Sequence, residues 1–228
     1  MPGIEESDSS KENTCARADA HLNKQLGGSL ARRLSAWRYK QMVRRALKQA
    51  GEPNLVLDLP CGGGRLWPLL AEQSKRVILA ADQSSDMLAI AQATQPADVL
   101  TRIRIFQTSV FDIELPDNAV DSIFCMHFLH RFGASEQRLA MLRELQRVAR
   151  DTLVVSLWVE GSYEARRPKP LPEKGAATDG HDAERKRFVI PKATIESEFR
   201  AVGFQILAHQ DCLPGLARWR VYVLRKAA

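Results

Sequence analysis

Short β-rich runs alternate with helical stretches over most of this chain, and that alternation restricts its fold more than any other feature. Runs of Val, Ile, Leu and Phe predict seven strands, at 54–59, 76–82, 102–107, 120–126, 152–159, 204–210 and 218–226. Amphipathic stretches predict helices at 65–74, 85–95, 135–150 and 191–201. Strands that alternate with helices favour a parallel sheet with helices on both faces. We therefore expect an α/β fold, a doubly wound sheet of seven strands that is mostly parallel, with an antiparallel last strand.

Residues at the helix ends support this assignment. Ser84 or Ser85 can cap the helix at 85–95, and Ser135 can cap the next one. Pro191 suits the first turn of the last predicted helix, because its missing N–H would have no helical partner there. The predicted boundaries therefore agree with the hydrophobic pattern.

Three segments depart from the alternation. Residues 1–20 have few apolar side chains, which predicts a mobile polar tail before a domain that spans 21–228. Residues 21–50 predict a basic helical cap of one or two helices, since 22–50 hold eight Lys or Arg and no acidic residue. Residues 160–187 are rich in Pro and charge without periodicity, which is typical of a flap inserted near a functional site.

The composition excludes several classes of protein. Apolar residues make up 45% and charged residues 26%, and no run is long enough to span a membrane. The first twenty residues lack the pattern of a signal peptide, which predicts a cytoplasmic protein that could also lie at the inner face of a membrane. The four cysteines have neither zinc nor disulfide spacing, so we expect no metal site.

The stretch LVLDLPCGGGR, at residues 55–65, places a glycine-rich turn directly after a predicted strand. A phosphate-binding loop would continue with Lys and Ser or Thr, whereas Arg65 and Leu66 follow Gly64 here. A dinucleotide fingerprint would place its third glycine where this chain has Trp67. A carboxylate at Asp58 is also better suited to a cationic group than to a pyrophosphate.

A second carboxylate follows at the spacing of a βαβ unit. The run Asp82-Gln83-Ser-Ser-Asp-Met87-Leu follows the glycines by about twenty residues. With Asp58-Leu-Pro60-Cys-Gly-Gly-Gly64, this pattern resembles the class I S-adenosylmethionine-dependent methyltransferases, in particular the ubiquinone and menaquinone branch that acts on small molecules. In the family motif a glycine stands at Pro60. The resemblance implies a Rossmann-like fold with S-adenosylmethionine as cofactor and S-adenosylhomocysteine as product.

The resemblance also implies which residues bind the cofactor. Asp82 would take the ribose hydroxyls, and the adenine contact has two possible registers, with Ser109 in one and Asp112 in the other. The predicted cofactor-binding residues are Asp58, Pro60, Cys61, Gly62, Gly64, Asp82, Gln83, Met87, Ser109, Val110, Asp112 and Met126.

Residues after the fourth strand should face the reacting methyl group, because ligands of open parallel sheets bind at the carboxyl ends of the strands. His127 and His130 follow that strand, and they are the predicted catalytic bases for a hydroxyl or amine acceptor. The sequence lacks the Pro-Pro-aromatic signature of amide and base methylation at this place. The expected acceptor is a small molecule or a lipid- or saccharide-linked group.

Two other classes of function stay open. The chain could be a methyltransferase-like scaffold without catalysis, or it could bind RNA through the basic segment, although the sequence argues against a nucleic-acid partner. The segment at 22–50 could also contact an anionic membrane surface or a protein partner.

Overall fold

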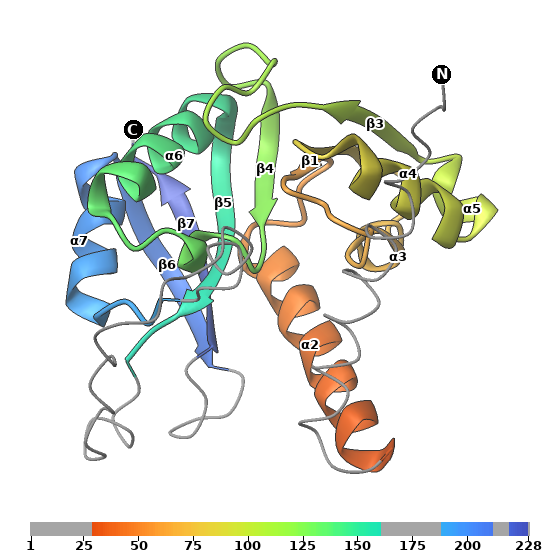
Figure 1. Ribbon diagram of the computed structural model, residues 1–228, viewed down its shortest axis with the longest axis horizontal. Coiled ribbons are helices and arrows are strands. Elements are labelled where there is room, and N and C mark those ends of the chain that lie inside the picture. The colour runs from red at the N-terminus through yellow and green to blue at the C-terminus, as the bar shows by residue number, and fades with distance from the viewer. Residues whose placement is uncertain (1–28, 161–187, 212–218, 228) are drawn as a thin grey trace, which may run out of the picture. The chain divides into compact units, whose positions relative to one another are not determined.

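A computed structural model describes residues 29–160, 188–211 and 219–227. The chain divides into two compact units, Met1–Gln41 and Met42–Ala228, and the second contains the sheet. Its seven strands lie in the order β3-β2-β1-β4-β5-β7-β6 (Figure 1). The strands are β1 (Leu55–Asp58), β2 (Val77–Asp82), β3 (Ile103–Gln107), β4 (Val120–Cys125), β5 (Ala149–Trp158), β6 (Phe204–Asp211) and β7 (Trp219–Lys226).

The pairing confirms the predicted fold class. Strands β1 to β5 pair in parallel, whereas β7 is antiparallel to both β5 and β6. The strand order reverses between β1 and β4, and in open α/β sheets ligands bind beside the carboxyl ends of the strands at this switch point. Asp58 ends β1 and Cys125 ends β4, so these two residues mark that place.

The helices of the described chain agree with the predictions in position more than in length. They are α2 (Ser29–Gln49), α3 (Trp67–Leu70), α4 (Ser85–Thr94), α5 (Ala97–Leu100), η1 (Leu129–Arg131, a 3₁₀ helix), α6 (Ser135–Val148) and α7 (Lys192–Ala201).

The prediction of a helix at 65–74 was wrong in its bounds, since α3 covers four residues between two turns. Gly64 has a positive φ of 72°, and buried Arg76 donates to the carbonyls of Leu70 and Pro53. These backbone constraints come from tertiary contacts, so periodicity could not predict them.

The two faces of the sheet contribute to different hydrophobic cores, because successive strand side chains point to opposite faces. Ala81 belongs to a large core with residues of α6 and α7, and neighbouring Ala80 belongs to a second core with Trp67 and Leu88. Figure 1 shows α6 and α7 near β5, β7 and β6, whereas α3, α4 and α5 gather near β1 and β3. Helix α4 also contacts β2. Helices therefore cover both faces, as expected for a doubly wound sheet.

In the second unit, residues Met42, Val43, Ala46 and Leu47 of α2 are buried. Arg44 forms a bidentate ion pair with Glu72, at 2.6 and 2.9 Å. Gln210 of β6 donates to the Met42 carbonyl and to the Gln49 side chain. The end of α2 is thus held both by apolar packing and by polar contacts.

A buried ion pair joins α6 and α7. Arg138 donates to both carboxylate oxygens of Glu198, at 2.5 and 2.8 Å, and each side chain is 5% exposed. Ser135 was expected to cap α6, but the N-cap position is Ala134, and the Ser135 hydroxyl donates to Glu198 at 2.6 Å instead. The hydroxyl binds a buried carboxylate of another helix, and the local sequence could not predict this contact.

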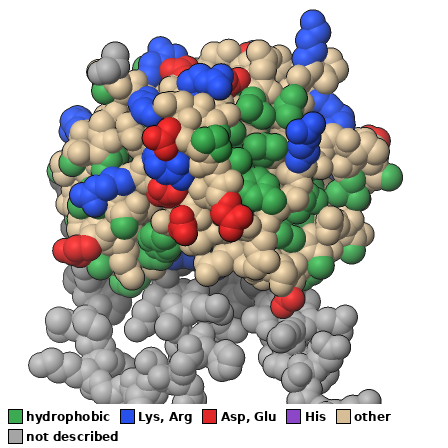
Figure 2. Space-filling model, turned by 90° about the horizontal axis from the view of Figure 1, so that it is seen from above, with side chains coloured by type: hydrophobic (Ala, Val, Ile, Leu, Met, Phe, Trp, Pro, Cys, Tyr) green, Lys and Arg blue, Asp and Glu red, His purple; other side chains and the backbone are tan. Residues whose placement is uncertain are grey.

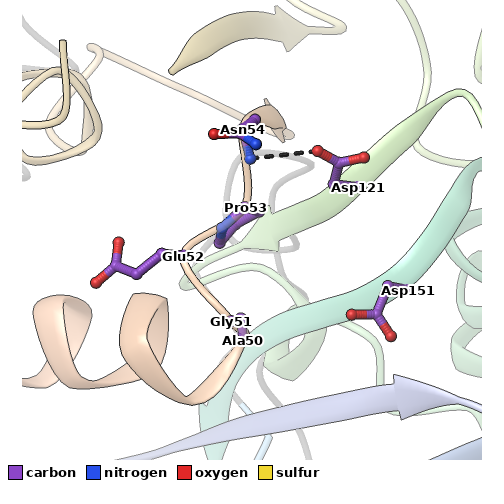
Figure 3. A pocket seen from close by; sticks show the side chains of 7 residues that line it. All are labelled: Ala50, Gly51, Glu52, Pro53, Asn54, Asp121 and Asp151. Carbon is purple, nitrogen blue, oxygen red and sulfur yellow. Dashed lines mark hydrogen bonds between the residues drawn. The ribbon is translucent and has the colours of Figure 1, made fainter. Parts of the chain in front are cut away.

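The amino ends of the parallel strands form the face drawn in Figure 2, where acidic and basic side chains interleave on one part and hydrophobic ones gather on another. A hollow of about 240 Å³ lies at this edge (Figure 3). Its carboxylates are already neutralised: Glu52 pairs with Arg76, Asp121 with Arg150 and Asp151 with Arg225. Because it lies at the edge opposite the glycine turn, we assign it no role in binding. It is lined by Ala50, Gly51, Glu52, Pro53, Asn54, Asp121 and Asp151.

The described residues on either side of the two gaps lie at the carboxyl edge of the sheet. They are Glu160 and Phe188 at the first gap, and Asp211 and Trp219 at the second. Most of the predicted flap and all of the predicted tail lie outside the described residues, so they stay predictions. Within the described ranges, no helix combines the length and the apolar character that a membrane span requires.

Candidate active site

The glycine-rich turn after β1 folds back against the end of β2. Cys61 N donates to the Ala81 carbonyl at 2.8 Å, and Gly62 N donates to Asp82 Oδ2 at 2.9 Å. Gly62 and Gly64 have positive φ angles of 51° and 72°, which glycine adopts without steric cost. Leu59-Pro60, which precedes them, has a cis peptide bond. The turn therefore presents bare backbone at the switch point, next to two carboxylates.

Trp67 explains why Gly64 must be a glycine. A Cβ at Gly64 would lie 2.7 Å from Cδ2 and Cε3 of the Trp67 ring. Trp67 is fully buried, so its ring has no room to move. The indole that argued against a dinucleotide site thus packs directly onto the turn.

Gly64→Ala should lower the free energy of unfolding by about 1–3 kcal/mol, because the substitution adds both a clash and a strained φ. Gly63→Ala is the matched control, since a Cβ at Gly63 would meet nothing within 4 Å. Urea unfolding of both variants measures the difference. Equal stability of the two variants would contradict the role of the Trp67 contact.

Asp82 is held in a fixed orientation by backbone donors. Its Oδ2 accepts from Gly62 N, and its Oδ1 accepts from Ser84 N at 3.0 Å. Ser84 in turn caps α4 by accepting from Met87 N at 3.3 Å. Each carboxylate oxygen keeps a lone pair for a further donor. This orientation suits the recognition of two adjacent hydroxyl groups.

Asp58 is 1% exposed, and its Oδ2 has no hydrogen-bond partner among the described residues. Burial raises the pKa of this carboxyl well above its usual range; the nearby Trp67 indole opposes this shift, and the charge of Asp82 adds to it. The Trp67 N–H also makes no hydrogen bond of good geometry to the described residues. A buried acceptor without a donor beside a glycine turn fits a ligand that brings a cationic donor.

The turn after β3 lies next to Asp82, because Thr108 N donates to the Asp82 carbonyl at 3.2 Å. Ser109 and Asp112 are the two ends of this turn, and Asp112 N donates to the Ser109 carbonyl. The Ser109 hydroxyl accepts from Phe111 N, whereas the Asp112 side chain is exposed. The turn places Ser109 and Asp112 close together, so either residue could make the predicted contact with adenine.

Four of the remaining predicted binding residues come from α4 and from the loops around the site. Val110 and Met126 are buried, with 4% and 7% of their surface exposed. Met87 is partly buried, and its Cε would be 3.7 Å from a Cβ on Gly62. Gln83 is exposed, and its carbonyl accepts from Gln107 Nε2 at 2.8 Å.

The two predicted bases occupy different environments. His127 is exposed, has a positive φ of 58° and stacks on Trp219, with ring centroids 4.7 Å apart and planes 4° from parallel. The backbone N–H of His127 donates to Ser156 Oγ at 2.8 Å, and this hydrogen bond fixes the backbone at the end of β4. His130 is 2% exposed and stacks on Trp158 at 5.9 Å. His127 is therefore the one of the two that a solvent-borne acceptor can reach.

Trp158 and Trp219 are direct partners in the β5–β7 register, so the two His–Trp pairs lie next to each other. The sequence marked Trp158 as an aromatic residue that could line an acceptor pocket or pack in the core, whereas it offered no reason to single out Trp219. The sequence feature that could have pointed to Trp219 is the antiparallel last strand, because such a strand begins at the edge of the sheet where β5 ends. Strand register, rather than spacing, brings these side chains together.

The buried thiols are poor nucleophiles. Cys125 is fully buried, and desolvation raises the pKa of its thiol. Cys61 is 8% exposed, and burial together with Asp58 and Asp82 raises the pKa of that thiol. Since the thiolate is the reactive form, neither residue fits covalent catalysis. No cluster of metal-ligating side chains occurs among the described residues either.

The sheet order, the glycine turn and the two carboxylates lie in the part of the chain that is similar to a known family of methyltransferases. The family described as "Methyltransferase domain" matches residues 56–152, which hold β1 to β4 and the start of β5. The ubiquinone and menaquinone branch is not singled out by these matches.

Curated proteins are similar to this chain in sequence over about half of its length, and solved structures share its fold. A tRNA U34 carboxymethyltransferase from Pseudoalteromonas atlantica is 31% identical over 129 residues, which are 56% of this chain and 38% of that protein. The chain spans less than half the length of the curated relatives it matches. The fold is shared by magnesium protoporphyrin IX methyltransferase from Synechocystis PCC 6803 with bound SAM, at a TM-score of 0.60, 18% identity and coverage of 83% and 80% of the two chains. The [4+2]-cyclase SpnF gives a TM-score of 0.61, 16% identity and coverage of 83% and 81%.

Proposed function

We propose that this chain transfers a methyl group from S-adenosylmethionine to a small-molecule or lipid- or saccharide-linked acceptor. The observation that carries the proposal is the pair of carboxylates at the switch point, Asp58 and Asp82, on either side of the glycine turn. A cyclase with the same fold shows that the fold does not fix the reaction. The proposal therefore depends on the chemistry of the site.

The residues of this site fit the cofactor in type and position. Asp82 is oriented for the two ribose hydroxyls, and the orphan oxygen of Asp58 suits the ammonium of the amino-acid part. The bare turn at Gly62 to Gly64 allows the ligand to approach the backbone. Either Ser109 or Asp112 would contact the adenine. When bound, the cofactor supplies a methyl group on a sulfonium and leaves as S-adenosylhomocysteine.

The protein would contribute mainly by positioning. An acceptor held against the end of β4 would be positioned for the transfer, and the effective concentration gained by such positioning would supply a large part of the rate. His127 would accept the acceptor's proton, since imidazole titrates near neutral pH and this ring is exposed. Buried His130 would support Trp158 and the wall of the site, as a positioning residue.

Calorimetric titration of the full chain with S-adenosylhomocysteine tests the proposal first. We expect micromolar binding, worth about 8 kcal/mol. Turnover of labelled cofactor is then measured with a metabolite extract and, separately, with bulk tRNA, because one relative is a tRNA enzyme. Binding without turnover in either assay would favour a scaffold, and turnover with tRNA alone would replace the proposed acceptor class.

Asp58→Asn tests the second carboxylate. We expect S-adenosylhomocysteine to bind at least ~10-fold more weakly, because a hydrogen bond to a charged group contributes about 1.5–3 kcal/mol. Without ligand, the raised pKa of Asp58 means that its ionisation opposes folding, so stability is lost as pH rises from about 4 through the folded pKa. The variant should therefore be more stable than the native protein at about pH 8, but not at about pH 4. Thermal unfolding at both pH values measures this, and a pH-independent difference would contradict it.

A further inference from the structure

Helix α2 exposes two large apolar side chains in the part that belongs to the first unit. Leu34 is 62% exposed and Trp37 is 56% exposed, and they are the two most exposed of the large hydrophobic residues described. Residues three apart lie on the same face of a helix, so the two form one apolar patch. This contrasts with Val43 and Leu47 further along α2, which are buried.

The charge around this patch has a single sign. The sequence of α2, Ser29–Gln49, contains seven Lys and Arg residues and no acidic residue. Arg33, Lys40, Arg45 and Lys48 are exposed. Arg44 forms an ion pair with Glu72 at 2.6 Å. An exposed Leu–Trp patch among basic residues is typical of helices that lie in a membrane interface, where the indole sits at the headgroup level and the cations meet anionic lipids.

We propose that α2 docks the protein on an anionic lipid surface through Leu34, Trp37 and the basic residues of the same helix. A second copy of the chain fits this face less well, because pairing the same helix would place seven cations against seven cations. A nucleic acid would satisfy the charges but would leave the apolar pair in water. Lipid satisfies both. The proposal does not depend on the methyl-transfer reaction.

Co-sedimentation with vesicles tests it. The full chain should bind vesicles of phosphatidylcholine with phosphatidylglycerol at least ~10-fold more tightly than phosphatidylcholine alone, since each Lys or Arg near an anionic surface contributes about five-fold. The preference should weaken as NaCl rises above ~0.15 M. Equal binding to both vesicles, or no binding, would overturn the proposal. Displacement by poly-U RNA with no dependence on Leu34 and Trp37 would overturn it in favour of a nucleic acid.

Two double variants distinguish the contribution of the apolar patch to vesicle binding from that of exposed apolar side chains elsewhere on the protein. Leu34→Ser with Trp37→Ser should reduce partitioning into the anionic vesicles at least ~10-fold. The matched control, Ile90→Ser with Leu207→Ser, removes side chains that are 39% and 40% exposed elsewhere, and should leave partitioning unchanged. Equal loss in both pairs would overturn the assignment to α2. Far-ultraviolet circular dichroism of each variant shows whether the domain is intact, and this readout does not depend on the cofactor site.

The tryptophan signal gives an independent readout. The native chain should show a blue shift of its fluorescence on adding the anionic vesicles, as an indole enters a less polar environment. Trp37→Phe should abolish most of this shift while it retains vesicle binding within ~3-fold, because Phe keeps most of the apolar area. A blue shift that persists in Trp37→Phe would show that another tryptophan meets the lipid, which would overturn this docking geometry.

Discussion

Asp82→Ala should weaken S-adenosylhomocysteine binding at least ~100-fold, the largest effect expected from any single carboxylate in the site. Two hydroxyl groups bonded to one carboxylate are worth about 1.5–3 kcal/mol each, and that sum corresponds to a loss of two or more decades. The substitution also frees Gly62 N and Ser84 N, which both donate to this carboxylate. Calorimetric titration measures the affinity.

Two further variants make the result specific. Asp82→Asn keeps one acceptor oxygen, and should bind with an affinity between those of the native protein and Asp82→Ala. Asp86→Ala removes an exposed carboxylate in the first turn of α4, close in sequence, and should bind as the native protein does. Native affinity in Asp82→Ala would remove the ribose assignment, and an equal loss in Asp86→Ala would indicate a general charge effect instead.

Arg138→Met should lower the free energy of unfolding by about 3–5 kcal/mol, because it leaves the Glu198 carboxylate buried without its cation. The guanidinium also donates to the carbonyls of Phe132 and Gly133, at 3.0 and 2.7 Å, so the loop before α6 loses its anchor. Urea unfolding followed by far-ultraviolet circular dichroism measures the change.

The exposed pair of Arg225 and Asp151 is the matched control for this prediction. Its side chains are 45% and 48% exposed, so Arg225→Met should cost no more than about 1 kcal/mol. The double variant Arg138→Met with Glu198→Met should recover much of the stability lost, because an apolar pair can replace a buried ion pair. Similar losses in Arg138→Met and Arg225→Met would contradict a special role for burial.

The sequence predicted the strands well, because each one is a short apolar run, and the central strands β1, β4 and β5 are largely buried on both faces of the sheet. The glycine turn was also predictable, since Asp58 and Asp82 end two strands and Gly62 lies between them, at a spacing that a βαβ unit imposes. Helix α3 was predicted too long, because Gly64 and Arg76 set its ends through contacts that lie outside the helix. The short helices α5 and η1 were not predicted, since three or four residues carry no periodic signal.

By itself, the sequence determined the fold class, the two carboxylates and the glycine turn between them, because hydrophobic periodicity and motif spacing are local properties of a chain. Only the tertiary structure decided which side chains share an environment. It placed Trp67 against Gly64, gave Ser135 to Glu198 rather than to its own helix, and left His127 exposed while burying His130. It also brought Trp219 against His127, although 92 positions separate them (219 − 127). Such contacts depend on strand register and on packing between distant elements, which no local pattern encodes.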